Sequence, residues 1–363
     1  MKTKGSRASQ KTRRAAPPSP ATVFPDRTVL YQYAAQGPRD AYEDVHHVAR
    51  VRGGWWVFLV CDGHAGVLAA HHVASEFPRS VERALRKGGD DVKNVVERIR
   101  EQVLLLDQEL KKAWFTNAAD VSDLMSVSDL KLQDTDMDMS TSTSTSASTN
   151  QNSDWGMAEA EAEADGDRNA GASYSVKKQQ GQQVNGFGAV TTLSDEKELD
   201  SGTTLAAWIW HPGKRMGYTV HVGDSRVAIL SKKRVVYMTQ DHKPQRASEA
   251  EWLSRYPGAV LANEPDRVQN RNGMSLGMSR SLGDFSFKRD GRVRALPEVR
   301  AFRFEAPLSI DIVIACDGLW DVWKAEEGVP AGRQPARELV EAALSRGTDD
   351  NVTVMVLRIR PRK

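Results

Sequence analysis

The sequence of 363 residues contains only two cysteines, Cys61 and Cys316. Neither has a second cysteine or a histidine at a zinc-binding spacing, and two lone thiols are typical of a reducing compartment. Each cysteine follows an apolar run and precedes an aspartate, so strand alternation predicts that its thiol points away from the side that the aspartate faces. We therefore expect both to be core residues.

The sequence also lacks a long hydrophobic run and a strong charge of one sign. No apolar stretch is long enough to cross a bilayer and no signal-peptide core is present, so we expect no membrane partner and a cytoplasmic or nuclear location. The formal net charge of +2 gives no general case for binding nucleic acid. We expect the protein to be a monomer.

Large apolar side chains are scarce in two segments. Residues 140–150 are nearly all serine and threonine, and residues 158–167 alternate alanine with acids. Such a stretch buries too little apolar surface to offset its ordering entropy, so we expect a disordered low-complexity insertion at about 116–199, either regulatory or inert.

Residues 1–23 carry six basic side chains and no acid. We interpret them as a disordered basic tail, with a nuclear-localisation patch and a transit peptide as alternatives.

Two apolar runs, 55–60 and 310–315, end in the same three residues, Cys-Asp-Gly. Each run predicts a strand buried on both faces, which releases Asp62 or Asp317 where a glycine lets the backbone turn sharply. Carboxylates gathered at one rim repel each other and are costly to desolvate. A site that collects them normally holds a hard cation.

Three further strand-to-turn junctions carry acids, namely Glu43 with Asp44, Gly223 with Asp224, and Asp349 with Asp350. The Gly-Asp turn predicts a hairpin between the two β-rich runs that flank it. Taken singly, each acid-bearing turn could be a structural turn and not a ligand site. Arg39 with Glu43 could equally be a surface ion pair, and His64 an ordinary partly buried histidine. Their joint occurrence favours a metal site.

These residues, in this order, resemble the metal-dependent serine/threonine protein phosphatases, the PPM or protein phosphatase 2C family. The resemblance covers about residues 24–115 and 200–360. It extends to the motifs Ser201-Gly202-Thr203-Thr204, Asp241-His242-Lys243-Pro244 and Leu276-Gly277-Met278-Ser279-Arg280-Ser281-Leu282-Gly283-Asp284-Phe285.

The resemblance implies an α+β fold, a β-sandwich of two mainly antiparallel sheets flanked by helices in α-β-β-α layers. We expect a single phosphatase domain over 24–360, interrupted by the insertion. Apolar residues at helical spacing predict two helices, within 73–85 and 92–110, on one sheet and a short helix over 336–344 on the other. We expect Pro78 to kink or divide the first helix.

The resemblance also implies two bound ions, Mg²⁺ or Mn²⁺, with oxygen ligands. The implied ligands are Asp62 for the position shared by both ions, Asp317 and Asp350 for one ion, and Glu43, the carbonyl of Gly63 and, through water, Asp44 for the other. A weaker third ion would lie at Asp224 and Asp321, beside Asp317.

The implied reaction is hydrolysis of phosphoserine or phosphothreonine in protein substrates by direct attack of a metal-bound water. Arg39 offers a planar fork for two phosphate oxygens. His64 would protonate the leaving oxygen as a general acid, and Asp62 would act through the shared metal position.

Two other functions compete with this interpretation. A catalytically silent pseudophosphatase would bind a regulatory partner through the same fold, and a metal-dependent phosphodiesterase or nuclease would use similar acids. A silent relative would have lost metal acids, whereas all of those implied here are present, which favours the enzyme. The segment 245–274 is expected to form a flap beside the site. Its four arginines would favour acidic or multiply phosphorylated substrates, unless they are ordinary surface residues.

Overall fold

The computed structural model describes residues 21–24, 28–86, 91–114, 200–305 and 309–360. All of them belong to one compact unit of the chain. The expected insertion at 116–199 and most of the expected basic tail lie outside the described residues. Among the described helices, none has the length and apolar character that a membrane crossing requires.

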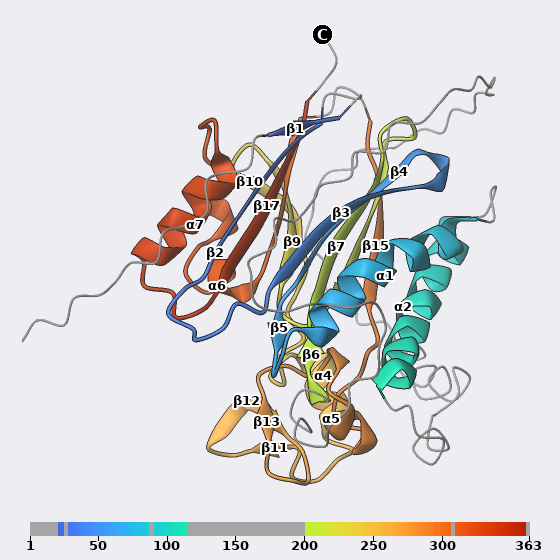
Figure 1. Cartoon of the computed structure of the whole chain (residues 1–363), viewed down its shortest axis with the longest axis vertical. Helices are drawn as coiled ribbons and strands as arrows, with labels where there is room; N and C mark the ends of the chain where they lie inside the picture. The colour runs from blue at the N-terminus through green and yellow to red at the C-terminus, as the bar shows by residue number, and fades with distance from the viewer. Residues whose placement is uncertain (1–20, 25–27, 87–90, 115–199, 306–308, 361–363) are drawn as a thin grey trace, which may run out of the picture. The chain divides into compact units, whose positions relative to one another are not determined.

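Two large sheets form the centre of this unit (Figure 1). The six-stranded sheet has the order β1 (Thr22–Val23), β2 (Val29–Ala35), β17 (Val352–Ile359), β16 (Ile310–Ala315), β9 (Arg226–Ser231) and β10 (Arg234–Met238). The five-stranded sheet has the order β15 (Glu298–Arg303), β8 (Met216–Val222), β7 (Leu205–His211), β4 (Trp55–Cys61) and β3 (Val45–Val51). Neighbouring strands are antiparallel in both sheets.

Apolar side chains from both sheets fill the space between them. Phe58 and Trp208 of the five-stranded sheet belong to the same buried cluster as Ile229, Ile314 and Met355 of the six-stranded sheet. The strands β4 and β16 are buried on both faces, which explains why their sequences, apart from Asp311, are apolar instead of alternating.

Helices cover the two outer faces. The helices α1 (Leu68–Leu85) and α2 (Val92–Trp114) pack together, with α1 against β3 and β4 and α2 against β15. The helices α6 (Asp317–Trp320) and α7 (Pro335–Ser345) pack against β17, and α7 also against β2. The α-β-β-α layers predicted from the sequence are confirmed (Figure 1). Short 3₁₀ turns lie at Arg52–Gly54 and Ala325–Glu327.

Two smaller sheets complete the unit. One joins β5 (Gly63–His64), β6 (Gly202–Thr203) and β14 (Leu282–Gly283), with β6 in the middle. The other joins β11 (Val260–Leu261), β12 (Glu264–Gln269) and β13 (Ser275–Leu276). This second sheet, with α4 (Ala247–Leu253) and α5 (Phe285–Arg289), has its own apolar core around Trp252, Val268 and Phe287. The segment 245–274, which was expected to form a flap, supplies α4, β11 and β12 of this group.

Three local expectations were wrong. The strands β8 and β9 lie in different sheets, so Gly223–Asp224 is a crossover between sheets and not the turn of a hairpin. Both strands are buried, and a run without alternation can pair in either sheet. Pro78 lies inside α1, so of the two expected outcomes, a kink or a division, the division is wrong. Thr22–Val23 pair with β2, so the last residues assigned to the tail belong to the six-stranded sheet.

The sandwich interior predicts a large cost for opening a cavity at Phe58, which is 1% exposed between the sheets. Phe58→Ala should lower the free energy of unfolding by about 3–5 kcal/mol, the usual loss for a buried Phe. Urea unfolding followed by circular dichroism measures this loss. As a control, Val236→Ala truncates a side chain that is 45% exposed and should change stability by less than about 0.5 kcal/mol. Equal losses in the two variants would contradict this packing.

Candidate metal centre

Strand pairing brings acids from distant parts of the chain to one end of the sandwich. Val45 pairs with Cys61 across β3 and β4, so Asp44 and Asp62 are the next residues on adjoining strands. Asp317 begins α6 directly after β16, and Asp350 lies two residues before β17, which pairs with β16. The strand ends therefore account for the convergence that the sequence predicted.

Asp62 is at the centre of this group. Burial raises the pKa of its carboxyl group well above the usual range, and the neighbouring acids raise it further; these acids are Asp44, Asp317, Asp224 and Asp350. Burial likewise raises the pKa of Asp44, although Thr353 donates a 2.6 Å hydrogen bond to its Oδ2. Protonation is thus the response of these acids to mutual repulsion when no cation is present.

Among the residues that the structure describes, two carboxylate oxygens are buried without a hydrogen-bond partner, Oδ1 of Asp317 and Oδ1 of Asp224. Buried oxygens without donors are costly in a protein interior, and a divalent cation such as Mg²⁺ or Mn²⁺ would satisfy them. Burial and the charge of Asp224 raise the pKa of Asp317 to about 7. The carboxylates of this group offer oxygen atoms, which fit a hard cation.

The expected third site at Asp224 and Asp321 already contains a cation of the protein itself. Lys243 donates to Oδ2 of Asp224. The side chain of Lys243 is 36% exposed, and burial raises the pKa of Asp321 while Lys243 lowers it. An ion at this position would compete with an ammonium group.

The glycines of the two Asp-Gly turns are sites of close backbone contact. A Cβ on Gly63 would lie 2.6 Å from the carbonyl oxygen of Glu43, and one on Gly318 would lie 1.9 Å from that of Asn351. A side chain at either position would push apart the two segments that carry the acids. Glycine is therefore required by the packing of one acidic turn against another.

The motif Ser201-Gly202-Thr203-Thr204 holds the backbone of Asp62. The Asp62 amide donates to Oγ1 of Thr204 over 3.0 Å, and Thr203 Oγ1 donates to the Asp62 carbonyl over 3.0 Å. Both polar groups of the turn are thus satisfied, and the Asp62 side chain remains available to the acidic group.

Arg39 forms an ion pair with Asp350, at 2.6 Å between Nη2 and Oδ2. Its side chain is 57% exposed, so the guanidinium group can move. Glu43 accepts a 2.7 Å hydrogen bond from the amide of Gly66. Both residues lie beside the acidic group, as expected, but each has a protein partner in this structure.

Cys61 and Cys316 are free and buried, as predicted. The predicted direction of the thiol is wrong for Cys316, whose sulfur lies within 4.8 Å of carboxylate oxygens of Asp44 and Asp62. The reason is that β16 ends at Ala315, so Cys316 precedes α6 and no longer follows strand alternation. Its thiol donates to the carbonyl of Asn351 over 3.3 Å.

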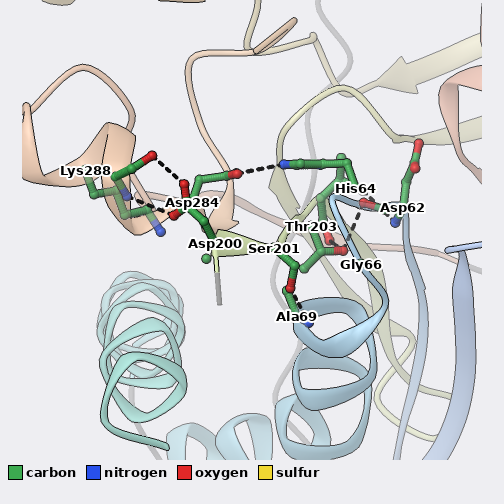
Figure 2. Close-up of polar contacts among 12 residues, drawn as sticks. Asp62, His64, Gly66, Ala69, Asp200, Ser201, Thr203, Asp284 and Lys288 are labelled. Atoms are coloured by element: carbon green, nitrogen blue, oxygen red, sulfur yellow. Dashed lines mark hydrogen bonds and ion pairs between the residues drawn. The ribbon is translucent and has the colours of Figure 1, made fainter. Parts of the chain in front are cut away.

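His64 contacts an acid that sequence reasoning did not assign to the site. Its Nε2 lies 2.8 and 2.9 Å from the two carboxylate oxygens of Asp284 (Figure 2). Burial lowers the pKa of His64, but Asp284 outweighs burial and the net shift is upward. Thr353 was also missed: its hydroxyl donates to Asp44 and accepts a 2.6 Å hydrogen bond from the Tyr42 hydroxyl. Of Asp284 and Thr353, only Asp284 belongs to one of the motifs on which the family resemblance rests.

A second cluster of possible ligands consists of His221, His242 and Glu298. The two imidazole rings are stacked with centroids 4.4 Å apart. Burial and the charge of Arg280 together lower the pKa of His242 to about 4. Arg246 is bound to Glu298 at 2.6 Å. A cation there would meet two guanidinium groups, so the cluster is better described as a neutral histidine pair.

The flap arginines are largely used by the protein itself. Arg267 donates to the side chain and carbonyl of Ser275, both over 2.9 Å, and Arg246 is bound to Glu298. Arg255 lies over the ring of Trp252. These contacts favour a structural role for the flap arginines over a role in selecting acidic substrates.

Comparisons with known proteins agree with this geometry. The sequence model of the family described as Protein phosphatase 2C matches residues 137–352, more than half of the chain. The matched range begins after the segment that holds Arg39 and Asp62, so the assignments there rest on motifs and geometry. A solved structure of serine-threonine phosphatase 2C from Toxoplasma gondii has a TM-score of 0.62 at 18% identity, covering 95% of this chain and 98% of that chain. At this identity the likeness shows the fold.

Two curated relatives match a shorter part of the sequence. The Arabidopsis thaliana protein named "Probable protein phosphatase 2C 76" is 32% identical over 182 residues, which is 48% of this chain and 41% of that protein. Protein phosphatase 1A from Bos taurus is 31% identical over 174 residues, 43% of each. The chain thus spans less than half the length of these relatives.

The raised pKa of Asp317 predicts that the chelated protein loses stability as the pH rises. An acid with a raised folded pKa contributes full stability below its unfolded pKa, near 4, and this contribution is lost as the pH rises toward 7. Thermal unfolding in EDTA should show Tm falling by about 5 °C or more between pH 5 and pH 8. Added Mn²⁺ should raise Tm more at pH 8, because protons compete with it at pH 5.

Asp317→Asn should weaken both the fall of Tm with pH in EDTA and the pH dependence of the increase in Tm with Mn²⁺. The matched control is Asp311→Asn, which removes a buried aspartate that is bound to Arg360 at 2.6 Å and should leave the metal response intact. A metal response that is equal at the two pH values, or unchanged in Asp317→Asn, would contradict the proposed origin of the shift.

Proposed function

The chain belongs to the protein phosphatase 2C family, and on that premise we propose that it is a metal-dependent protein serine/threonine phosphatase. One observation carries the proposal. Carboxylates from four segments converge on Asp62, and Oδ1 of Asp317 is buried there without a donor. A protein would not retain this costly arrangement without a cation to offset it.

We assign the cation ligands as follows, for Mg²⁺ or Mn²⁺ at two positions. Asp62, Asp317 and Asp350 would hold one cation, and Asp62, Glu43, the Gly63 carbonyl and, through water, Asp44 would hold the other. When bound, the cations would supply a water of lowered pKa as nucleophile and positive charge for a phosphoryl oxygen. The ammonium group of Lys243 argues for weaker affinity at the third position, Asp224 with Asp321.

The protein's own side chains then bind the substrate and move a proton. Arg39 would leave Asp350 and donate two parallel hydrogen bonds to the phosphate, which the acids would otherwise repel. His64 would transfer a proton to the serine or threonine oxygen as the ester bond breaks. Its partner Asp284 holds the ring at 2.8 Å.

The substrates that follow from this assignment are phosphoproteins. Free thiols at Cys61 and Cys316 support action in a reducing compartment, the cytoplasm or the nucleus. We propose that the catalytic unit acts as a monomer, as a single domain over 24–360.

The proposal predicts metal-dependent hydrolysis of a phosphothreonine peptide by the purified chain. Turnover should require Mn²⁺ or Mg²⁺, stop with chelator and fall by more than about 100-fold in Asp317→Asn, since even outer-shell changes at metal sites cost 10- to 100-fold. Phosphate release measures it. A folded protein that binds Mn²⁺ but releases no phosphate would overturn the enzyme and leave the partner-binding pseudophosphatase.

Arg39 should contribute through phosphate binding. Arg39→Ala should lower kcat/KM on the same peptide by about 10- to 100-fold, because hydrogen bonds to charged groups contribute about 1.5–3 kcal/mol each. Inhibition by inorganic phosphate should weaken in parallel. Arg337→Ala is the control: it removes an exposed arginine on α7, which pairs with Glu341 at 2.7 Å. Equal kinetics for the two variants would exclude the role assigned to Arg39.

A further inference from the structure

The small sheet β14-β6-β5 brings two distant motifs to either side of one glycine. His64 in β5 and Gly283 in β14 both pair with Gly202 in β6. A Cβ on Gly202 would lie 2.1 Å from Oδ2 of Asp284 and 2.4 Å from Nε2 of His64. The contact between His64 and Asp284 therefore occupies the space that any side chain at residue 202 would need.

Asp284 is held in an unusual backbone conformation to make this contact. Its φ is +50°, in the left-handed region that few non-glycine residues adopt, and it follows Gly283 with φ +84°. Its side chain is 3% exposed. Although it is the residue that precedes α5, its carboxylate makes no capping hydrogen bond there. The side chain is instead directed to His64.

Acids on other segments, buried Asp107 and half-buried Asp200, fix this turn. Asp107 of α2 accepts hydrogen bonds from the Gly283 amide over 2.8 Å and from Lys288 over 2.5 Å. Asp200 accepts from the amide of Ser286 over 2.9 Å. In Figure 2, Asp200 and Lys288 lie on the far side of the contact between His64 and Asp284 from Asp62. The turn is thus supported independently of His64.

The pairing also determines which imidazole nitrogen is used. A carboxylate only accepts hydrogen bonds, so Nε2 of His64 carries a hydrogen directed at Asp284. In the part of the chain that the structure describes, the ring has no other hydrogen-bond partner. Nδ1 is therefore the nitrogen left to exchange a proton with a substrate.

We propose that Asp284 is a positioning residue for His64, which fixes the ring so that Nδ1 delivers the proton to the leaving oxygen. The inference rests on the proposed function and adds a residue to it. The alternative is that the buried pair only stabilises the fold, as many buried ion pairs do. If Asp284 is a positioning residue, its substitution affects activity only when His64 is present. If the pair only stabilises the fold, the effect does not require His64.

The test uses Asp284→Asn, because asparagine tolerates the left-handed conformation and keeps the side-chain shape. An amide can donate to Nε2 and so favour the wrong tautomer. Hydrolysis of a phosphothreonine peptide should fall by about 10- to 100-fold, part of what general-acid catalysis supplies. Hydrolysis of p-nitrophenyl phosphate, whose leaving group needs no proton, should change by less than about threefold.

A double-mutant cycle separates positioning from stability. In a His64→Gln background, Asp284→Asn should have no further effect on peptide hydrolysis, since its partner is gone. A purely structural role would give the same loss in both backgrounds and on both substrates, and would overturn the inference. Asp311→Asn controls for the loss of a buried aspartate and should not distinguish the two substrates.

A spectroscopic measurement needs no turnover. In ¹⁵N-correlated spectra of the side chains, with His64→Gln used for assignment, the wild type should show His64 with hydrogen on Nε2, and Asp284→Asn should lose this tautomer. An unchanged tautomer would overturn the inference. If the wild type showed the tautomer but no metal-dependent turnover, the proposed function would fail while the positioning of the ring stood.

Discussion

Mutual repulsion among buried carboxylates is the interaction on which this structure depends. Burial and neighbouring acids raise the pKa values of Asp62, Asp44 and Asp317 together, so each acid makes the next one harder to ionise. The protein offsets part of this cost with donors placed at the edge of the group, such as Thr353 on Asp44. It leaves Oδ1 of Asp317 without a donor. Stability and metal affinity are therefore opposed at this end of the sandwich: the arrangement that destabilises the empty protein is the one that favours a divalent cation.

The sandwich makes this arrangement possible because its strands cannot move apart easily. Asp62 and Asp317 follow the strands β4 and β16, whose residues are buried except for half-buried Trp56, so apolar packing over several residues fixes the backbone positions of these acids. The glycine contacts extend this rigidity beyond the strands, since Gly63 and Gly318 leave no room between acidic turns. Repulsion is consequently met by protonation, by Arg39 and by Lys243 instead of by separation of the turns.

The sequence predicted what depends on local pattern and missed what depends on pairing across the fold. Apolar runs ending in Asp-Gly indicated that Asp62 and Asp317 would meet, and antiparallel pairing brings their strand ends together. The crossover at Gly223–Asp224 was missed because a local turn signal does not say which sheet each flanking strand joins. Cys316 was misjudged because alternation applies only within a strand. The contact of His64 with Asp284 spans 220 residues in sequence, and neither residue's neighbours reveal it.

Arg39 and Lys243 would compete with a divalent cation for the acids of this site. Both are cations bound to acids of the group, and both keep part of the side chain in solvent, 57% for Arg39 and 36% for Lys243. A divalent cation bound by Asp350 would compete with Arg39 for this carboxylate, so metal binding would release the guanidinium group toward solvent. A released guanidinium group is free to bind phosphate, and a bound phosphate would in turn disfavour its return to Asp350. Metal and phosphate would then each strengthen the binding of the other, as any two ligands do that displace the same internal ion pair.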